Sequence, residues 1–178
     1  MLFGLLDVPH LIEFASLDVV LFLIGMMLVI GFMEERKFFE HIIEQLISFV
    51  GKKAVALTVT MLVVSFIAAA LVDEVTSILF MCAIMLHLTR RYHLDPKPFV
   101  LMLVFCTNTG SSATVVGNPI GVMIALRGGF TFMDFLRWAF PIAALSLFVA
   151  IIFCLFFFRK SVQNLQHEMK KEGKGALP

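Results

Sequence analysis

Charged residues are scarce in this chain of 178 residues: they make up 15% of it, whereas 60% of the residues are hydrophobic. Soluble domains carry about a quarter charged residues and roughly half apolar ones. One Trp and one Tyr stand against 20 Phe and 11 Met, so few of the aromatic side chains carry a polar group. Together with a mean hydropathy of +0.98, these counts exclude an ordinary soluble domain and indicate an integral membrane protein.

The sequence also lacks the usual patterns of disulfide, metal and catalytic sites. Its three cysteines, Cys82, Cys106 and Cys154, lie in apolar runs without ligand spacing, and we interpret them as small buried hydrophobic residues. His41 and His87 belong to no His-x-x-x-His pattern, and no Gly-x-Ser-x-Gly occurs, which argues against an intramembrane enzyme. We therefore expect no enzymatic activity, no cofactor and no nucleic-acid partner.

A cleavable signal peptide is not expected either, because Met1–Leu17 has no basic segment and carries Asp7 and Glu13. The chain instead contains a series of apolar runs. The first is about 25 Å long at 1.5 Å per residue, which is enough for a membrane span. The last precedes a charged tail that we expect to be frayed or disordered. The runs are Leu17–Met33, Ala54–Val72, Val75–Leu88 and Phe135–Phe158.

Residues 35–50 follow a different pattern. Apolar side chains such as Phe38, Ile42 and Leu46 recur at helical spacing, and charged side chains such as Lys37 and Glu44 fill the opposite face. This pattern predicts an amphipathic helix that lies in the membrane interface. The alternative is an ordinary soluble helix packed on a core.

The distribution of positive charge predicts a topology. Of the 14 Lys and Arg residues, all but Arg127 and Arg137 lie in residues 34–53, 89–97 and 159–174. The positive-inside rule places these three regions, and with them the C-terminus, in the cytoplasm. Residues 54–88 must then enter and leave the membrane on the same side. Two full spans would satisfy this, but the short polar turn favours a re-entrant hairpin whose tip stops near the midplane.

Asp73 and Glu74 form the turn between the two central apolar runs and are followed by Val75, Thr76 and Ser77. A single carboxylate at the bilayer centre costs about 2.5–3.5 kcal/mol on insertion scales. Such a group persists where it faces a cavity, a cation or a proton. The sequence therefore predicts an ion site here; the alternative is a tight loop outside the membrane with solvated acids.

A second polar run begins at Thr107 and ends at Ser112, with Gly110 inside it. We expect it to break a helix at mid-depth, with the helix resuming near Ala113 and a second interruption at Asn118-Pro119. An unwound segment exposes carbonyl groups to a cation and helix N-termini to an anion. The alternative is a kink in which Ser and Thr side chains donate to carbonyl groups of their own helix.

Three stretches resemble one repeat of the ion transporter superfamily: LFLIGMMLVIGFMEERKFFEHI, ALVDEVTSILF and NTGSSATVVGNPIGVMIA. That group includes the arsenite pump membrane subunit, the D-type sodium/proton antiporters, the P protein and the divalent anion/sodium symporters. The resemblance covers about residues 17–160. It implies a re-entrant hairpin with an Asp-Asn-Val-Thr-Thr-like tip that faces a broken helix, and the two would line the ion and substrate site of the repeat.

Matching the motifs residue by residue assigns Asp73, Val75 and Thr76 to the hairpin tip, with Ser77 in place of a second Thr. Asn108, Gly110, Thr114, Gly117 and Pro119 match the broken helix. The chain departs from the family at Ser111, Ser112, Asn118 and above all Glu74, where Asn is usual. The substrate and ion site is therefore predicted at Asp73, Glu74, Thr76, Ser77, Asn108, Thr109, Gly110, Ser111, Ser112, Thr114 and Asn118, with sodium at Asp73 and Asn108.

The resemblance implies an all-α integral membrane protein of the cytoplasmic membrane, with several spans and half of an inverted-repeat transporter. The predicted parts are a span at 17–33, the interfacial helix at 35–50, the hairpin at 54–88, the broken helix at 98–126, a span at 134–158 and a cytoplasmic tail at 161–178. It would move a small arsenite-like or carboxylate-like anion by alternating access, coupled to Na⁺ or H⁺. A second copy or a complementary half would complete it within the lipid. The alternatives are half of a cation/proton antiporter and a non-transporting accessory subunit or fragment.

Overall fold

The computed structural model describes residues 17–36 and 53–175, and every regular element in these residues is an α-helix. The interfacial helix expected at 35–50 lies almost wholly outside the described residues. The all-helical class predicted from the sequence is confirmed for residues 17–36 and 53–175. In chain order the helices are α2 (Leu17–Glu35), α4 (Ala54–Leu71), α5 (Glu74–Arg91), α6 (Lys97–Ser111), α7 (Pro119–Gly128), α8 (Phe132–Phe157) and α9 (Arg159–Gly175).

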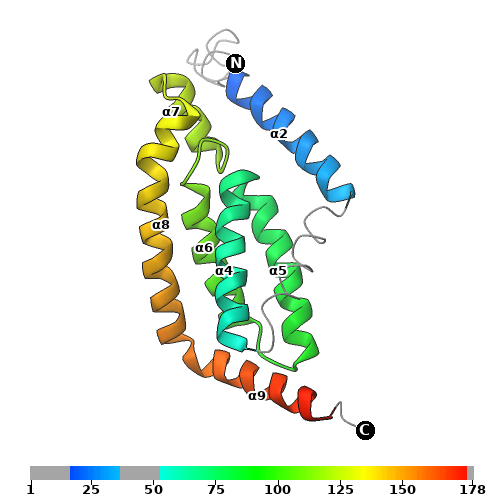
Figure 1. Cartoon of the computed structure of the whole chain (residues 1–178). Helices are drawn as coiled ribbons and strands as arrows, with labels where there is room; N and C mark the ends of the chain where they lie inside the picture. The colour runs from blue at the N-terminus through cyan, green and yellow to red at the C-terminus, as the bar shows by residue number, and fades with distance from the viewer. Residues whose placement is uncertain (1–16, 37–52, 176–178) are drawn as a thin grey trace, which may run out of the picture.

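Helices α4 and α5 form an antiparallel hairpin, and α6 runs beside both of them (Figure 1). Residues buried along α5 recur every fourth position, at Ser77, Met81, Met85 and Thr89, so one face of this helix points inward. The α4 and α6 helices each bury a similar stripe, which includes Leu62 of α4. The core therefore lies between three helices that are adjacent in sequence.

Two of the described helices, α4 and α8, are long and apolar enough to cross a membrane. They differ in surroundings: half of α4 is buried inside the bundle, whereas only 11% of the α8 window is buried. Helix α8 nevertheless contacts α4 and α6 through residues such as Ala143 and Cys154. Its large exposed side chains, such as Phe148 and Phe156, would be unfavourable in water and suit a surrounding of lipid or of other apolar helices.

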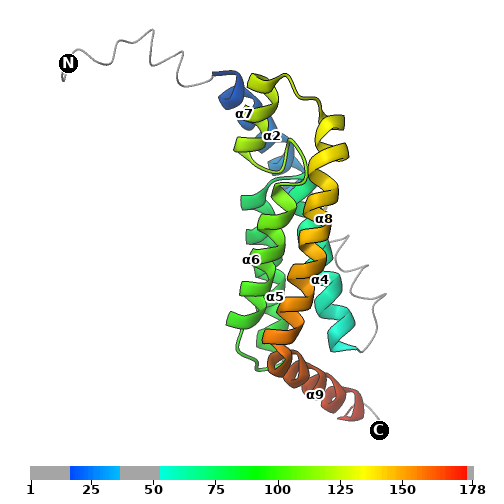
Figure 2. The ribbon, with the colours of Figure 1, turned by 90° about the vertical axis from the view of Figure 1, so that its left-hand side faces the viewer.

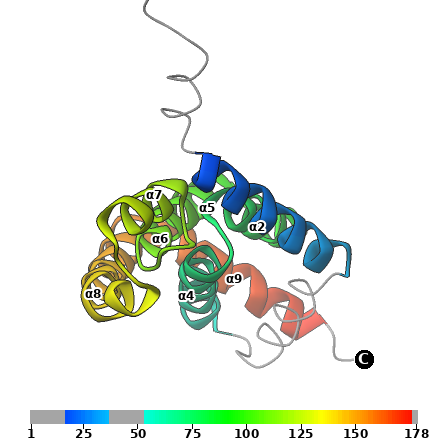
Figure 3. The same ribbon diagram turned by 90° about the horizontal axis from the view of Figure 1, so that it is seen from above.

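The expectation of a frayed tail is wrong for residues 159–175, which form helix α9. This helix lies across the lower end of the bundle and extends sideways beneath it (Figures 1 and 3). Val162 and Leu165 are buried on the bundle, and the Gln166 side chain accepts a hydrogen bond from the Ala54 backbone N–H at 2.9 Å. An amide that begins a helix has no partner within it, so Gln166 satisfies the first turn of α4. Composition suggested disorder, but an apolar face at helical spacing and this contact order the tail.

Positive charge gathers at the same end of the bundle. Helix α4 begins there after Lys53, α5 ends there at Arg90 and Arg91, and α6 begins there at Lys97. Helix α9 adds Arg159, Lys160, Lys170 and Lys171. The grouping predicted for regions 89–97 and 159–174 thus appears as one surface. Residues 34–36, which the sequence grouped with these regions, do not join this surface. They end helix α2, which contacts α7 beside the upper part of the bundle and does not reach the basic end.

Candidate functional site

The tip of the hairpin meets the interruption between α6 and α7. The tip consists of residues 70–74, from the end of α4 to the first residue of α5, and the interruption consists of residues 112–118. Two hydrogen bonds join them: the Glu74 N–H donates to the Gly117 carbonyl at 3.0 Å, and the buried Thr114 hydroxyl donates to the Ala70 carbonyl. Residues more than 40 positions apart are therefore held together by one backbone–backbone and one side chain–backbone hydrogen bond.

The Glu74 side chain makes a third link. One of its carboxylate oxygens, Oε2, accepts a hydrogen bond from the buried Ser111 hydroxyl at 2.9 Å, and the same hydroxyl lies 3.0 Å from the Asn108 carbonyl. A hydroxyl has one proton to donate and two lone pairs to accept. An ionised Glu74 receives that proton, whereas a protonated Glu74 can donate to Ser111, whose proton then turns to Asn108. The contact therefore accommodates both protonation states without movement of heavier atoms.

Two helix N-termini point into the same region. Asp73 caps α5, with its Oδ1 accepting from the Thr76 N–H at 2.8 Å, and Asn118 caps α7 by accepting from the Gly121 N–H at 2.8 Å. Asp and Asn are among the best capping residues, and Pro119 suits the first position of a helix because it needs no donor there. The Asn118 amide also donates to the Ser111 carbonyl at 2.8 Å. The positive ends of two helix dipoles thus lie beside the Glu74 carboxylate.

The predicted break is displaced along the chain. Residues 107–111 continue α6, and the helix resumes at Pro119 rather than near Ala113. The hydroxyls of the polar run donate to carbonyls one turn earlier, for example from Thr107 to Leu103 at 2.6 Å and from Thr109 to Phe105 at 2.8 Å. This is the back-bonding alternative, which lets Ser and Thr remain inside a helix. Asn118-Pro119 is the start of a helix and not a further interruption.

Gly110 does not break the helix; it lets two helices approach. A Cβ atom at this position would lie 2.2 Å from the Phe66 carbonyl oxygen, so α4 passes directly over it. Gly117 serves a similar purpose in the interruption, since a Cβ there would lie 2.3 Å from the Ser111 carbonyl oxygen. Both glycines therefore allow close backbone contacts that a side chain would prevent.

The structure separates the predicted site residues into two groups. Asp73, Glu74, Thr76, Ser111, Thr114 and Asn118 lie at the junction of the tip and the interruption. Asn108 and Ser112 are exposed, and Thr109 lines a groove between α6 and α8. Ser77 is 3% exposed, and its hydroxyl has no hydrogen-bond partner among the described residues. That hydroxyl lies on α5 one turn after Glu74.

Sequence reasoning missed the backbone acceptors of the site. The carbonyls of Gly117 and Ala70 receive hydrogen bonds across the junction, although neither residue has a polar side chain. The Gly-Asn-Pro order could have indicated the first of them, because an N-cap followed by Pro marks a helix start and places the preceding residue outside the helix. No comparable signal exists for Ala70.

Helix lengths give the depth of the site. Helix α6 has 15 residues and α7 has 10, so at 1.5 Å per residue they measure about 22 Å and about 15 Å. Helix α8, with 26 residues, measures about 39 Å and is close to their combined length. Figure 2 shows the hairpin tip level with the interruption and below α7. The site therefore lies nearer the upper end of the bundle but well short of it.

The charges available at the site are negative. No Lys or Arg occurs between Lys53 and Arg90 or between Lys97 and Arg127, so neither the hairpin tip nor the interruption carries a basic side chain of its own. Within residues 17–36 and 53–175, no group of three or more His, Cys, Asp or Glu side chains is placed to hold a metal ion. A bound Na⁺ would need carbonyl and hydroxyl oxygens beside one carboxylate, an oxygen set that suits hard cations.

Comparison with known proteins identifies the sequence class. The family model described as citrate transporter matches residues 1–173. A Mycobacterium tuberculosis protein described as an uncharacterised transporter is 31% identical over 76% of this chain and 31% of its own length. The silicon efflux transporter LSI3 of Oryza sativa is 29% identical over 80% of the chain and 30% of its length. The P protein of Homo sapiens is 25% identical over 66% of the chain and 14% of its length.

The chain spans about a third of the length of the first of these relatives. No solved structure matches it significantly. The resemblance to the ion transporter superfamily is nevertheless confirmed, because the matched proteins include a P protein and an efflux transporter.

Proposed function

This chain belongs to the citrate transporter family, and we propose that it is one repeat of an ion-coupled secondary transporter that moves a small anion by alternating access. The observation that carries the proposal is the junction of the hairpin tip with the interrupted helix, where Glu74, Ser111 and Gly117 meet. An interrupted helix and two helix N-termini inside a membrane are the features from which transporters build substrate sites.

An anion would bind at the N-termini of α5 and α7. The two ends offer positive dipoles, and the hydroxyls of Ser111 and Thr114 would turn their protons from Glu74 and the Ala70 carbonyl to the anion. Because Lys and Arg are absent from both segments, a negative substrate also needs a coupling cation to offset Asp73 and Glu74. Asp73 would hold Na⁺ or shape the site, and Glu74 would exchange the proton, since its contact with Ser111 suits both protonation states.

A second candidate is half of a cation/proton antiporter. The same two carboxylates and the absence of nearby Lys and Arg favour it. In that case the carboxylates would bind Na⁺ and H⁺ in alternation and no anion would be required. Uptake of a carboxylate or an arsenite-like oxyanion distinguishes the two functions, because only the anion transporter moves it.

The depth of the junction supports a re-entrant hairpin. The hydrocarbon core of a bilayer is about 30 Å thick. Helix α7 adds about 15 Å above the junction, so a membrane that covers α8 also encloses the tip of the hairpin. The tip then lies inside the bilayer, covered by α6, α7 and whatever completes the assembly.

We predict that Lys53, Arg90 and Lys160 all face the cytoplasm, because they lie at the basic end of the bundle and the positive-inside rule places that end in the cytoplasm. Cysteines placed singly at these positions in a Cys-free background should react with an impermeant thiol reagent only when it reaches the cytoplasmic side. A cysteine in place of Arg127 is the control. Arg127 lies in the last turn of α7, at the end of the bundle away from the basic end, and this cysteine should react from outside. Labelling of position 90 only from outside would show that the re-entrant hairpin is wrong.

The coupling ion should stabilise the purified chain if the junction is an ion site. Ligand at 100 times its Kd stabilises a folded state by about 2.7 kcal/mol. We therefore expect the unfolding midpoint to rise by several degrees in Na⁺ over matched K⁺, or to depend on pH. Glu74→Gln should remove the pH dependence. A midpoint that responds to neither ion would favour the accessory-subunit alternative instead.

A further inference from the structure

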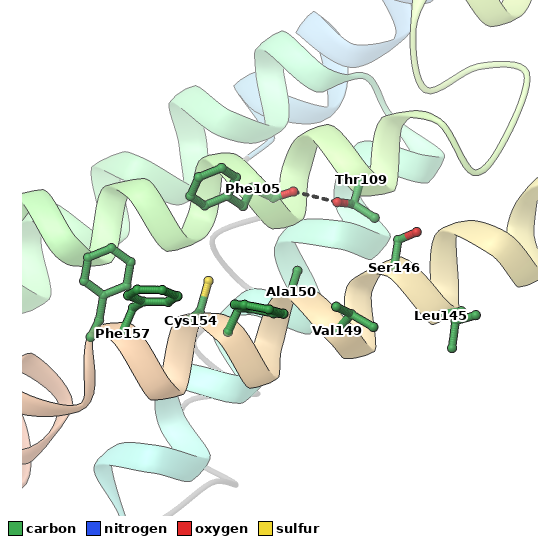
Figure 4. Close-up of a pocket in the computed structure, with 10 residues that line it drawn as sticks. Phe105, Thr109, Leu145, Ser146, Val149, Ala150, Cys154 and Phe157 are labelled. Atoms are coloured by element: carbon green, nitrogen blue, oxygen red, sulfur yellow. Dashed lines mark hydrogen bonds between the residues drawn. The ribbon is translucent and has the colours of Figure 1, made fainter.

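A groove of about 740 Å³ runs between α6 and α8 on the outside of the bundle (Figure 4). Helix α6 contributes Phe105 and Thr109. Helix α8 contributes residues from Leu145 to Phe157, and Phe158 follows at its C-terminal end. Along α8 this stretch measures about 20 Å, compared with about 15 Å for the hydrocarbon of one leaflet. The groove is therefore long enough to hold the chain of one lipid.

The chemistry of the groove suits hydrocarbon. Its two hydroxyl groups are already used, because Thr109 donates to the Phe105 carbonyl at 2.8 Å and Ser146 donates to the Ile142 carbonyl at 2.9 Å. The remaining wall consists of apolar side chains such as Phe105 and Phe153, each more than half exposed. Neither hydroxyl has a proton left to donate to a polar ligand, whereas an acyl chain needs no hydrogen-bond partner.

The lower end of the groove opens onto the basic end of the bundle. Phe157 and Phe158 are followed directly by Arg159 and Lys160, both exposed. The acidic residues with described side chains at this end are Asp95 and Glu168. Lys171 donates to Glu168 at 2.7 Å and this hydrogen bond lowers the pKa of that carboxyl, so the pair neutralises part of the charge at the far end of α9. Arg159 and Lys160, next to the groove, have no such acidic neighbour in α9, because Glu168 lies two turns further along the helix.

We propose that this groove is a binding site for an anionic phospholipid of the leaflet at the basic end. One acyl chain lies along α8 in the groove, and the phosphate lies against Arg159 and Lys160. Basic pockets between membrane helices bind anionic head groups in this way. Charge argues against a second copy in parallel orientation, because two basic ends would then be brought together.

Native mass spectrometry of the full chain, titrated with phosphatidylglycerol and with phosphatidylcholine of the same acyl chains, tests the site. Each cation near an anionic lipid contributes about 1 kcal/mol, or roughly fivefold in affinity. Replacing both Arg159→Gln and Lys160→Gln should therefore weaken phosphatidylglycerol about 25-fold and leave phosphatidylcholine unchanged. Lys170→Gln with Lys171→Gln removes the same charge from the same helix and should have little effect.

The groove itself is tested by Val149→Trp, which fills it, against Ile152→Trp, which adds the same bulk to an exposed position of α8 outside it. Val149→Trp should weaken both lipids about tenfold, while Ile152→Trp should not, with the same helix content by circular dichroism. Equal loss of phosphatidylglycerol binding from the Arg159/Lys160 and the Lys170/Lys171 double variants would overturn the proposal in favour of diffuse surface charge. Lipid binding unchanged by Val149→Trp, or a dimer that this variant dissociates, would likewise overturn it and assign the groove to protein.

Discussion

Gly110→Ala is expected to be among the most destabilising single substitutions in the chain. The added Cβ would lie 2.2 Å from the Phe66 carbonyl oxygen and 2.8 Å from its carbonyl carbon and Cα. These are backbone atoms of α4, so no side-chain rotation relieves the overlap and the two helices must separate. The Ser65–Thr107 hydrogen bond of 2.7 Å would stretch with them.

We expect a loss of about 3 kcal/mol or more, the upper part of the range for overpacked cores. For a chain of this size such a loss lowers the unfolding midpoint by roughly 6–12 °C. Gly25→Ala is the matched control, because nothing lies within 4 Å of a Cβ at that helical position. That substitution should be neutral or slightly stabilising. A Gly110→Ala midpoint equal to that of the wild type would show that α4 and α6 do not pack this closely.

Asp73→Asn is expected to abolish transport by the complete assembly, to below about a hundredth of the wild-type rate. Asn caps a helix as well as Asp does, so the contact with the Thr76 N–H and the fold should survive. The loss of transport in this variant would then be caused by the lost negative charge and not by unfolding. Asp95→Asn is the matched control: Asp95 accepts from the Lys97 N–H at 3.1 Å at the basic end, far from the junction, and its variant should transport normally.

Glu74→Gln should give a different result in the same proteoliposome assay. The amide oxygen still accepts from Ser111, but it cannot take up a proton, so transport should persist while its pH dependence flattens. Glu74→Asn, which restores the residue usual in the family, should behave in the same way. An unchanged pH profile in Glu74→Gln would remove Glu74 from the coupling mechanism. Transport that survives Asp73→Asn would remove Asp73 from the cation site.

Local chemistry was enough to predict much of the fold. Long apolar runs between charged clusters determine where helices lie, because a backbone in hydrocarbon must satisfy its own hydrogen bonds. The pair Asp73-Glu74 marked the turn between α4 and α5, and the distribution of Lys and Arg indicated which helix ends lie together. These features are encoded within short windows, so a single sequence was sufficient to find them.

Contacts between distant residues decided the rest. The tertiary structure shows Gly110 as a point of close approach to Phe66, a role that depends on a helix more than 40 positions earlier. It also shows residues 107–111 as helical, because their hydroxyls donate to their own helix, and it orders α9 through its packing on α4. The site itself needed the same information, since the Gly117 carbonyl becomes a partner of Glu74 only when the hairpin folds against the interruption. Sequence patterns report what each residue can do, whereas the packing of α4, α5 and α6 determines which residues meet.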